Sequence, residues 1–298
     1  MEIVVLCGGE SSERAVSLCS GERVSIALRE RGHRVSLLDY RQDPLGADWL
    51  ARMRGADAVY LALHGGAGED GSLQSELEQN GIFHYTGSDA AGAALAMQKD
   101  RAKVTVSAMG VPVAKGCILR PGEPMQELPE PPLVVKPLAG GSSVGLSFLE
   151  SKRELRALHL SEPMLCEPFL PGREYTVGLL GDRVLPAVEI CPIGGRYDYE
   201  HKYTPGATQE LCPAPITSER SAKLADLALV CFATLGLRDL ARIDFKEDAA
   251  GEICFLEANA CPGMTPTSLL PLAAKTAGIS FGQLCEQIAM MAAARKRA

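Results

Sequence analysis

The chain has 298 residues, 46% of them hydrophobic and 22% charged, a composition that excludes a disordered or collagen-like chain and fits two or three domains of roughly 100–200 residues each. Its 30 lysines and arginines against 37 aspartates and glutamates leave a net charge of −7, without the basic stripe of a nucleic-acid binder. No apolar run approaches the ~20 residues of a membrane span. We therefore expect neither a nucleic acid nor a membrane as partner.

The cysteines and the first residues bear on the compartment in which the protein works. Ten cysteines are scattered without a C-x-x-C pair, the close spacing that zinc sites need. Most lie in apolar runs, which predicts buried free thiols that pack as small hydrophobic side chains. Residues 1–9 lack the basic and long apolar segments of a signal peptide, so we expect a cytoplasmic protein.

Residues 1–88 predict an N-terminal α/β domain with a parallel sheet. Apolar runs alternate with helical stretches, which is the pattern of βαβ units. Gly32 and Gly81 follow the helical stretches, where a glycine commonly ends a helix. The expected strands cover residues 3–6, 34–39 and 58–63, and the expected helices cover residues 14–31 and 72–79.

Residues 89–171 and 172–298 predict a central and a C-terminal domain of the α+β type. Five prolines between residues 120 and 132 mark a linker in the first of these. In the second, Ser280 and Gln283 form a capping box at the start of the last helix. The expected helices cover 90–97, 100–109, 151–159, 218–235 and the segment from 280. The expected strands cover 115–119, 133–136, 145–149, 164–167, 175–180, 184–190, 240–246 and 252–258. A loop is expected over 191–213.

The strongest candidate for chemistry is a polar cluster on the predicted strands 240–246 and 252–258. Residues i and i+2 of a strand share a face, so Arg242 lies beside Asp244, and Glu257 beside Asn259. A hairpin turn at 248–251 would place Asp244 nearly opposite Glu257. Two carboxylates and a carboxamide at one spot suit Mg²⁺. The alternative is a surface hairpin with solvated charges, which the apolar flanks disfavour.

A second candidate is the Gly/Ser loop that follows Lys136. Small residues over 139–145 let backbone N–H groups close around phosphate oxygens, and the lysine adds a positive charge. The loop is not a Walker A motif, because no G-K-[ST] opens a helix. An ordinary hairpin turn is the alternative.

Two short patterns point to other enzyme classes and are outweighed. Residues 141–145 fit the G-x-S-x-G of serine hydrolases, but the residues after them read as strand where that motif needs a helix. Residues 66–71 fit G-x-G-x-x-G, but two carboxylates in that loop would repel a pyrophosphate. An acidic loop beside His64 suits an ammonium ligand better. Glu13 and Lys99, taken alone, also fit a helix-opening residue and a solvated helix lysine.

Taken together, several motifs in one order and spacing resemble the D-alanine–D-alanine ligases of the ATP-grasp superfamily over nearly the whole chain. The anchors are Gly8-Gly9 with residues 12–18, residues 62–65 with 68–71, Lys136-Pro137 with residues 141–145, residues 197–203, residues 242–244, residues 256–259 and residues 262–265. The resemblance implies an ATP-grasp fold behind an N-terminal parallel-sheet domain. It implies ATP-dependent joining of two D-alanines through an acyl phosphate, as used for peptidoglycan precursors.

The resemblance also assigns residues to ATP and metal. ATP would lie between the central and C-terminal domains, with Glu167 and the backbone of Phe169 and Leu170 on adenine and Glu174 on the ribose. The phosphates would be held by Lys99, Lys136 and Lys202, and two Mg²⁺ ions, or Mn²⁺, by Asp244, Glu257 and Asn259.

Other residues would hold the two amino acids. The ammonium of the first D-alanine would lie near Glu13 and His64, and the oxyanion near Arg242 and the backbone N–H of Gly263. Lys202, Ser268 and the N–H of Leu269 would bind the second carboxylate. A hydrogen-bonded triad of Glu13, Ser142 and Tyr203 would hold a loop over the site.

Two departures and three alternatives accompany the resemblance. Gly140 stands where some relatives carry glutamate, and the proline linker looks shorter than the insert of many relatives. Tyr203 favours D-alanine over D-lactate as second substrate, because the depsipeptide-forming relatives typically differ there. A D-lactate ligase, a ligase for another D-amino acid and a silent nucleotide-binding regulator remain the alternatives. A homodimer is implied.

Overall fold

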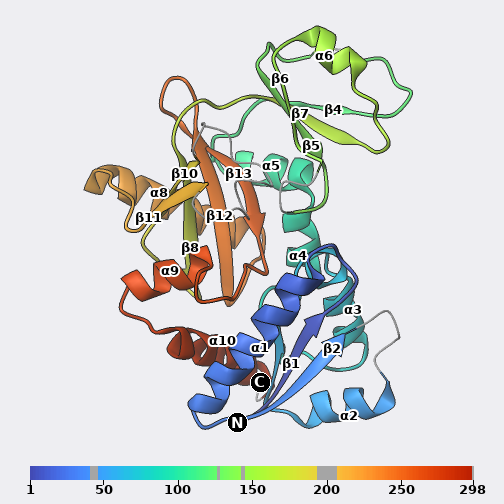
Figure 1. Cartoon of the computed structure of the whole chain (residues 1–298), viewed down its shortest axis with the longest axis vertical. Helices are drawn as coiled ribbons and strands as arrows, with labels where there is room; N and C mark the ends of the chain where they lie inside the picture. The colour runs from blue at the N-terminus through green and yellow to red at the C-terminus, as the bar shows by residue number, and fades with distance from the viewer. Residues whose placement is uncertain (41–45, 126–127, 142–144, 193–206, 297–298) are drawn as a thin grey trace.

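The computed structural model describes residues 1–40, 46–125, 128–141, 145–192 and 207–296. Three sheets follow one another along the molecule, from a parallel sheet near the N-terminus to a small sheet at the opposite end (Figure 1). The arrangement confirms the expected fold class, α/β at the N-terminus and α+β beyond it.

The N-terminal sheet is parallel, as expected. Its strands are β1 (Glu2–Gly8), β2 (Arg34–Tyr40) and β3 (Ala58–Leu61), in the order β2-β1-β3. Strands β1 and β3 are almost wholly buried, which matches their uninterrupted apolar sequences. The helices are α1 (Arg14–Glu30), α2 (Ala47–Gly55) and α3 (Ser72–Gln79), with a short 3₁₀ turn, η1, at Gly66–Gly68.

The small sheet at the far end is antiparallel and has the order β4-β7-β5-β6. Its strands are β4 (Cys117–Leu119), β5 (Leu133–Pro137), β6 (Ser147–Leu149) and β7 (Met164–Pro168), and helix α6 (Lys152–Ala157) follows β6. Leu133, Val135 and Cys166 are buried beneath it with Leu155 of α6. Alternate residues of β5 and β7, among them Lys136 and Glu167, are thereby left to line a pocket.

The largest sheet has six strands in the order β11-β10-β8-β12-β13, with β9 paired to β8. The strands are β8 (Glu174–Leu180), β9 (Arg183–Val184), β10 (Val188–Pro192), β11 (Thr208–Leu211), β12 (Leu240–Glu247) and β13 (Ile253–Asn259). One face packs against α8 (Ser218–Thr234) and against α4 (Ala90–Met97) and α5 (Lys99–Ser107). The opposite face near Asp244 is left open for a site.

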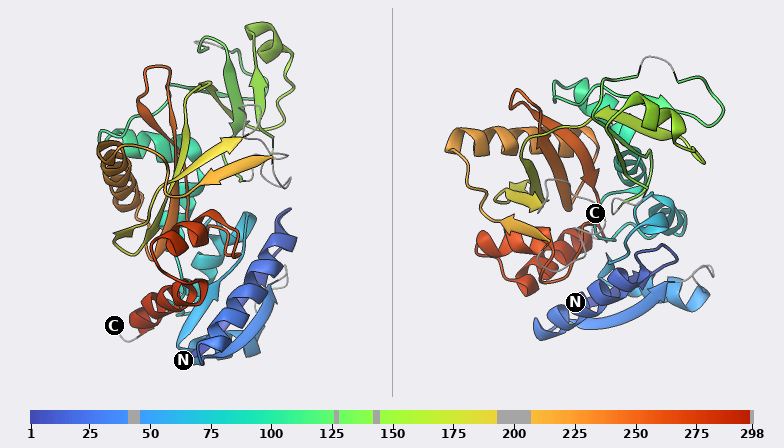
Figure 2. Two further views of the ribbon diagram at one scale, coloured as in Figure 1. Left: turned by 60° about the vertical axis from the view of Figure 1, so that its left-hand side comes forward. Right: turned by 45° about the horizontal axis from the view of Figure 1, so that its top comes forward.

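The C-terminal helices connect the largest sheet to the N-terminal unit. Helices α9 (Leu269–Thr276) and α10 (Phe281–Lys296) share a buried core with β1 and α1 (Figures 1 and 2). The capping box is confirmed, since Ser280 N–H donates to Gln283 and Gln283 N–H to Ser280. The C-terminal helices thus pack against the expected N-terminal domain, and the domain division remains a prediction.

The structure corrects the sequence analysis at four elements. Helices α2 and α9 were not expected. Helix α9 carries Pro271 in its first turn, where a backbone N–H would have no partner inside the helix, so a residue without an N–H is tolerated. The expected strand 184–190 is divided into β9 and β10 at Pro186, which has no N–H to give to a ladder. Strand β11 lies inside the expected loop 191–213 and pairs with β10.

The ten cysteines all lie in the described residues and all are free thiols, as expected. Five are buried and four are half-buried, but Cys19 on α1 is exposed, which corrects the expectation for that residue. Burial raises the pKa of Cys166 to about 12 and that of Cys231 to about 12, so these thiols stay protonated at neutral pH. In the described part of the chain no helix is long and apolar enough to cross a membrane.

Candidate active site

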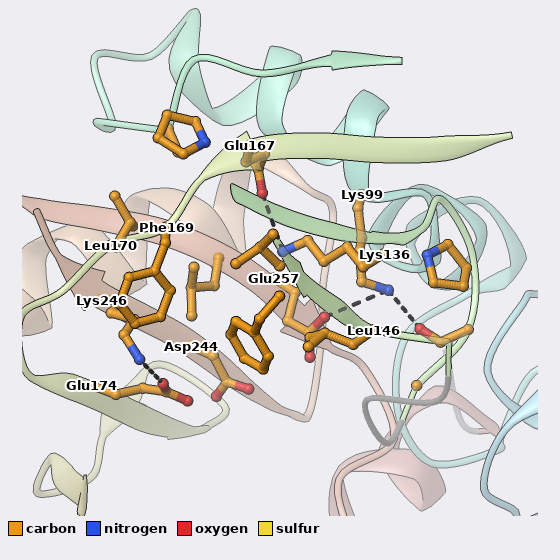
Figure 3. A pocket seen from close by; sticks show the side chains of 18 of the residues that line it. Lys99, Lys136, Leu146, Glu167, Phe169, Leu170, Glu174, Asp244, Lys246 and Glu257 are labelled. Carbon is orange, nitrogen blue, oxygen red and sulfur yellow. Dashed lines mark hydrogen bonds and ion pairs between the residues drawn. The ribbon is translucent and has the colours of Figure 1, made fainter. Parts of the chain in front are cut away.

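A pocket lies between the small sheet and the largest sheet, with about 1040 Å³ of space that is partly open to solvent. Its lining combines apolar side chains with a few charged groups, as is typical of a small-molecule site. The pocket brings together eight of the residues expected to bind ATP or metal, and Arg242, which was expected at the oxyanion. The eight are Lys99, Lys136, Glu167, Phe169, Leu170, Glu174, Asp244 and Glu257. They come from six elements and the loop after β7, so the pocket depends on how the two sheets are placed (Figure 3).

One end of the pocket is built around Glu167 on β7, whose side chain is almost fully buried. Lys103 Nζ lies 2.6 Å from Oε1 and Lys136 Nζ lies 3.2 Å from Oε2. Burial favours the neutral acid, but the two lysines outweigh it and hold the pKa of Glu167 below its usual value. Glu167 is therefore an ionised hydrogen-bond acceptor at the edge of the pocket.

Apolar side chains flank this end. The rings of Phe148 and Phe169 meet edge to face with 5.8 Å between their centroids, and Leu170 lies beside them in the lining. The backbone N–H of Phe169 donates to the Pro132 carbonyl, so this N–H is already engaged. A flat aromatic group would fit between these side chains and the edge of Glu167.

The next part of the pocket pairs Glu174 on β8 with Lys246 on β12, whose Nζ donates to Oε2 over 2.7 Å. Burial raises the pKa of Glu174, and Lys246 opposes that shift. Lys246 Nζ also lies 5.5 Å from the centre of the Phe169 ring, a cation–π contact. Lys246 therefore holds Glu174, which can accept from hydroxyl groups, and also contacts Phe169 in the wall of the pocket.

Lys99 lies at the opposite end, at the start of α5. Its Nζ donates to the Gly140 carbonyl over 2.5 Å and lies 3.5 Å from Glu257 Oε2 (Figure 3). Gly140 has a φ of 112°, which a residue with a side chain rarely adopts. Lys99 is thereby bonded to Gly140, at the start of the glycine loop, and both Lys99 and Lys136 line the cavity.

The hairpin of β12 and β13 has the expected register, with Asp244 opposite Glu257 and Arg242 opposite Asn259. Its turn forms because Asp248 Oδ1 accepts the N–H groups of residues 250 and 252. The prediction that Asp244 and Glu257 converge is confirmed.

Each carboxylate of the hairpin has a cationic partner. Arg242 Nε and Nη2 donate to the two oxygens of Asp244 over 2.9 and 3.0 Å, and Thr176 Oγ1 donates to Oδ1 over 2.6 Å. Among the described residues no group of three or more His, Cys, Asp or Glu side chains is arranged to hold a metal. The carboxylate oxygens of Asp244 and Glu257 and the carboxamide oxygen of Asn259 suit Mg²⁺, which commonly also takes phosphate oxygens and water as ligands.

A second pocket opens on the other side of Arg242, between the N-terminal unit and α9. Arg242 lines both pockets, so the two cavities meet at one guanidinium. The second pocket contains the expected amino-acid residues Glu13, His64, Gly263, Ser268 and Leu269, together with Asn259.

His64 and Glu13 form the N-terminal wall of the second pocket. His64 is buried, with Nε2 2.8 Å from Ser20 Oγ and Nδ1 3.2 Å from the Cys261 carbonyl. Gly65 has a φ of 65°, and a Cβ there would lie 3.0 Å from Glu13 Oε2. Only glycine lets the loop after His64 approach the Glu13 carboxylate this closely.

The opposite wall is the start of α9. Ser268 precedes the helix, and its Oγ accepts the N–H of Thr265 over 3.2 Å. The N–H of Leu269 is the first of the helix and has no intrahelical partner. Gly263 approaches so closely that a Cβ would lie 2.9 Å from Ser268 Oγ. A hydroxyl and helix N–H groups therefore face the cavity, an arrangement that suits a carboxylate.

Three expected site residues, Ser142, Lys202 and Tyr203, lie outside the described residues, so their roles stay predictions. The sequence analysis missed Lys246 and Glu210, which line the pockets, and Lys103, which lies behind the lining and pairs with Glu167. The two-residue alternation from Asp244 could have indicated Lys246. Lys103 gave no such signal, because its ion pair depends on how α5 packs against β7.

Comparison with known proteins agrees with this geometry. Residues 121–290 match the family described as D-ala D-ala ligase C-terminus. The chain is 43% identical to the D-alanine–D-alanine ligase of Brucella anthropi, over 95% of this chain and 94% of that protein. It is 40% identical to the ligase of Gluconobacter oxydans, over 99% of this chain and 100% of that one.

Solved structures agree as well. The D-alanine–D-alanine ligase of Bacillus anthracis complexed with ATP matches with a TM-score of 0.84 and 27% identity, over 100% of this chain and 99% of that chain. The VanG D-Ala:D-Ser ligase of Enterococcus faecalis matches with a TM-score of 0.84 and 28% identity, over 98% and 99%. On these likenesses and on the two pockets that meet at Arg242, the chain belongs to the D-alanine–D-alanine ligase family.

Proposed function

We propose that this protein joins two D-alanines to D-alanyl-D-alanine at the expense of ATP, releasing ADP and phosphate, for the synthesis of peptidoglycan precursors. The observation that carries this proposal is the pair of pockets that meet at Arg242. One pocket has a lining that suits a nucleotide, and the other has a carboxylate at one wall and a helix N-terminus at the other. A carboxylate substrate between them can meet both a phosphate and a second amine.

ATP is proposed to lie along the first pocket. Glu167 would accept from the adenine amino group, with Phe169 and Leu170 against the ring, and Glu174 would bind the ribose hydroxyls. Lys99 and Lys136 would hold the phosphates, with Lys202 as a third cation. The support is that the described members of this set line one cavity, with Lys99 bonded to Gly140 of the glycine loop and Lys136 Nζ 3.2 Å from Glu167.

We propose that Asp244, Glu257 and Asn259 hold two magnesium ions, with manganese as the alternative. The register of the hairpin supports this set, because Asp244 and Glu257 face one another and Asn259 follows on the same face. When bound, the metal supplies positive charge to the phosphate oxygens during transfer. Arg242 and Lys99, which pair with these carboxylates, would then turn toward the substrates.

The first D-alanine is proposed to place its ammonium near Glu13 and His64. Its carboxylate attacks the γ-phosphate, and an acyl phosphate and ADP result. The amine of the second D-alanine attacks the acyl carbon, forms the amide and expels phosphate. Arg242 and the Gly263 N–H would stabilise the oxyanion of that step, because fixed donors act most strongly where charge develops.

The second D-alanine is proposed to bind through its carboxylate to Ser268, the Leu269 N–H and Lys202. The position of Ser268 and Leu269 at the start of α9 supports this assignment. The triad of Glu13, Ser142 and Tyr203 is proposed to hold a loop over the site and keep water from the acyl phosphate. We also propose a cytoplasmic homodimer.

A measurement of phosphate release tests the proposal. ATP and Mg²⁺ are mixed with D-alanine, L-alanine, D-lactate or D-serine, and products are identified by mass spectrometry. Release with D-alanine together with the dipeptide is expected. Release that requires D-lactate or D-serine would favour the alternative ligases, and ATP binding without any release would favour a silent regulator.

A further inference from the structure

Glu167, the carboxylate at the end of the pocket proposed for adenine, pairs with two lysines that differ in their surroundings. Lys136 lines the cavity, where the proposed function gives it to the phosphates. Lys103 approaches from behind, from α5, and contacts the other oxygen at 2.6 Å. The two partners of Glu167 are therefore distinct: one faces the ligand and the other faces the protein.

Lys103 is held in its place by the fold. It is 5% exposed, and its Nζ donates to the Phe255 carbonyl on β13 over 3.1 Å as well as facing Glu167. Lys103 is absent from the described lining of the cavity, so it acts on a ligand only through Glu167.

We infer that Lys103 is a positioning residue that keeps Glu167 ionised and oriented when nucleotide draws Lys136 to the phosphates, and that it thereby selects a purine with a 6-amino group. The inference rests on the proposed function, because it requires ATP in this pocket with its base at Glu167. It concerns which base is accepted and not whether ligation occurs.

The selection follows from hydrogen-bond chemistry. An ionised carboxylate only accepts, so it bonds to the 6-amino group of adenine and repels the 6-keto oxygen of hypoxanthine. A buried carboxylate without a cation takes up a proton, because burial disfavours the charged form. The protonated acid can donate to the 6-keto oxygen, and the preference for adenine is lost.

The experiment compares ATP with inosine triphosphate as phosphoryl donor for D-alanine-dependent phosphate release. The quantity is the ratio of the two kcat/KM values. Lys103→Met is expected to lower this ratio by about 10- to 100-fold, mainly through a higher KM for ATP, since a polar site rejects a mismatched partner by such factors or more. Glu167→Gln, which can both donate and accept, is expected to lower it similarly. Lys103→Arg keeps the charge and is expected to keep the ratio within about threefold.

The double variant Lys103→Met/Glu167→Gln tests whether Lys103 acts on the ratio through Glu167. Its ratio is expected to equal that of Glu167→Gln alone, because without the carboxylate there is nothing left for Lys103 to hold. Lys223→Met is the matched control, since Lys223 of α8 pairs with Glu252 over 2.9 Å at the surface and neither residue lines the pocket. It is expected to leave the ratio unchanged.

Equal losses with both nucleotides in Lys103→Met, so that the ratio stays at the wild-type value, would overturn the inference and leave Lys103 a structural residue. Should Lys103→Met fail to fold, Lys103→Gln replaces it with the same expected ratio, since its amide can still donate to the Phe255 carbonyl. Calorimetric binding of ATP and inosine triphosphate without D-alanine gives the same comparison. If wild-type protein binds ATP but does not release phosphate with D-alanine, the proposed function fails while the binding ratio still decides the role of Lys103.

Discussion

The nucleotide pocket and the amino-acid pocket are built by different means. In the first, four carboxylates each lie within ion-pair distance of a lysine or arginine: Glu167, Glu174 and Glu257 pair with a lysine on a neighbouring element, and Asp244 pairs with Arg242 of its own strand. In the second, Ser268 and His64 are held by backbone groups and hydroxyls. Charge therefore organises the site for the polyanion, whereas short hydrogen bonds and close glycines organise the site for the small zwitterion.

This difference predicts how strongly a substitution in each pocket should act and which substrate it should affect. Breaking one member of a buried ion pair leaves an uncompensated charge and should be costly. Losing a hydroxyl from the second pocket removes one hydrogen bond and should be mild. Arg242 lines both pockets and should affect both substrates.

The largest effect is expected for Asp244→Asn. The substitution removes a proposed metal ligand and one partner of the Arg242 pair. We expect kcat for phosphate release to fall by about 10³-fold, because charge stabilisation at the transferred phosphate is lost. Thermal unfolding checks that the variant folds. Activity within about threefold of wild type at saturating magnesium would contradict the proposed metal set.

Arg242→Met removes the guanidinium that lines both pockets. We expect kcat to fall by about 10²-fold, the usual loss for one oxyanion donor. ATP affinity without D-alanine should change less, by about tenfold or below, and calorimetry measures it separately. A loss confined to ATP affinity, with kcat intact, would place Arg242 in the nucleotide site alone.

Ser268→Ala sharpens the comparison because it touches only the second pocket. We expect the KM for the second D-alanine to rise by about tenfold, which corresponds to one hydrogen bond to a carboxylate. The dissociation constant for ATP should stay within about twofold. Steady-state kinetics over a wide D-alanine range separates the two constants, and an equal weakening of ATP would contradict the separation of the pockets.

The smallest effect is expected from pH. Burial lowers the pKa of Lys103 to about 8, and the positive charge of Lys136 lowers it further. The carboxylate of Glu167 and the nearby Cys254 act in the opposite direction and raise it. Lys103 is charged below that pH and loses its proton above it, so Glu167 loses its nearer cation as pH rises. ATP affinity should fall a few-fold between pH 7 and 9 in calorimetry. A similar fall in Lys103→Met would exclude this cause.

Several parts of this account follow from sequence patterns. The alternation around Asp244 and the turn at 248–251 predicted the facing carboxylates, and the structure pairs Asp244 with Glu257. The capping box at Ser280 was also predictable, because it depends on residues three apart. Local spacing was sufficient in both cases.

Other parts require the three-dimensional structure. Strand β11 lies in a proline- and glycine-rich segment and is stabilised by pairing with β10, a contact that no local pattern displays. The ion pair of Lys103 with Glu167 joins residues 64 positions apart on a helix and a strand. The roles of Ser142, Lys202 and Tyr203 rest on the family resemblance alone and remain predictions.

The transfer of an oxygen from D-alanine to phosphate tests the central claim most directly. D-alanine labelled with ¹⁸O in its carboxylate is incubated with ATP and Mg²⁺, and the released phosphate is analysed by mass spectrometry. Attack of the carboxylate on the γ-phosphate predicts one labelled oxygen in the phosphate for each dipeptide formed. Unlabelled phosphate, or release of AMP and pyrophosphate, would contradict an acyl-phosphate ligase.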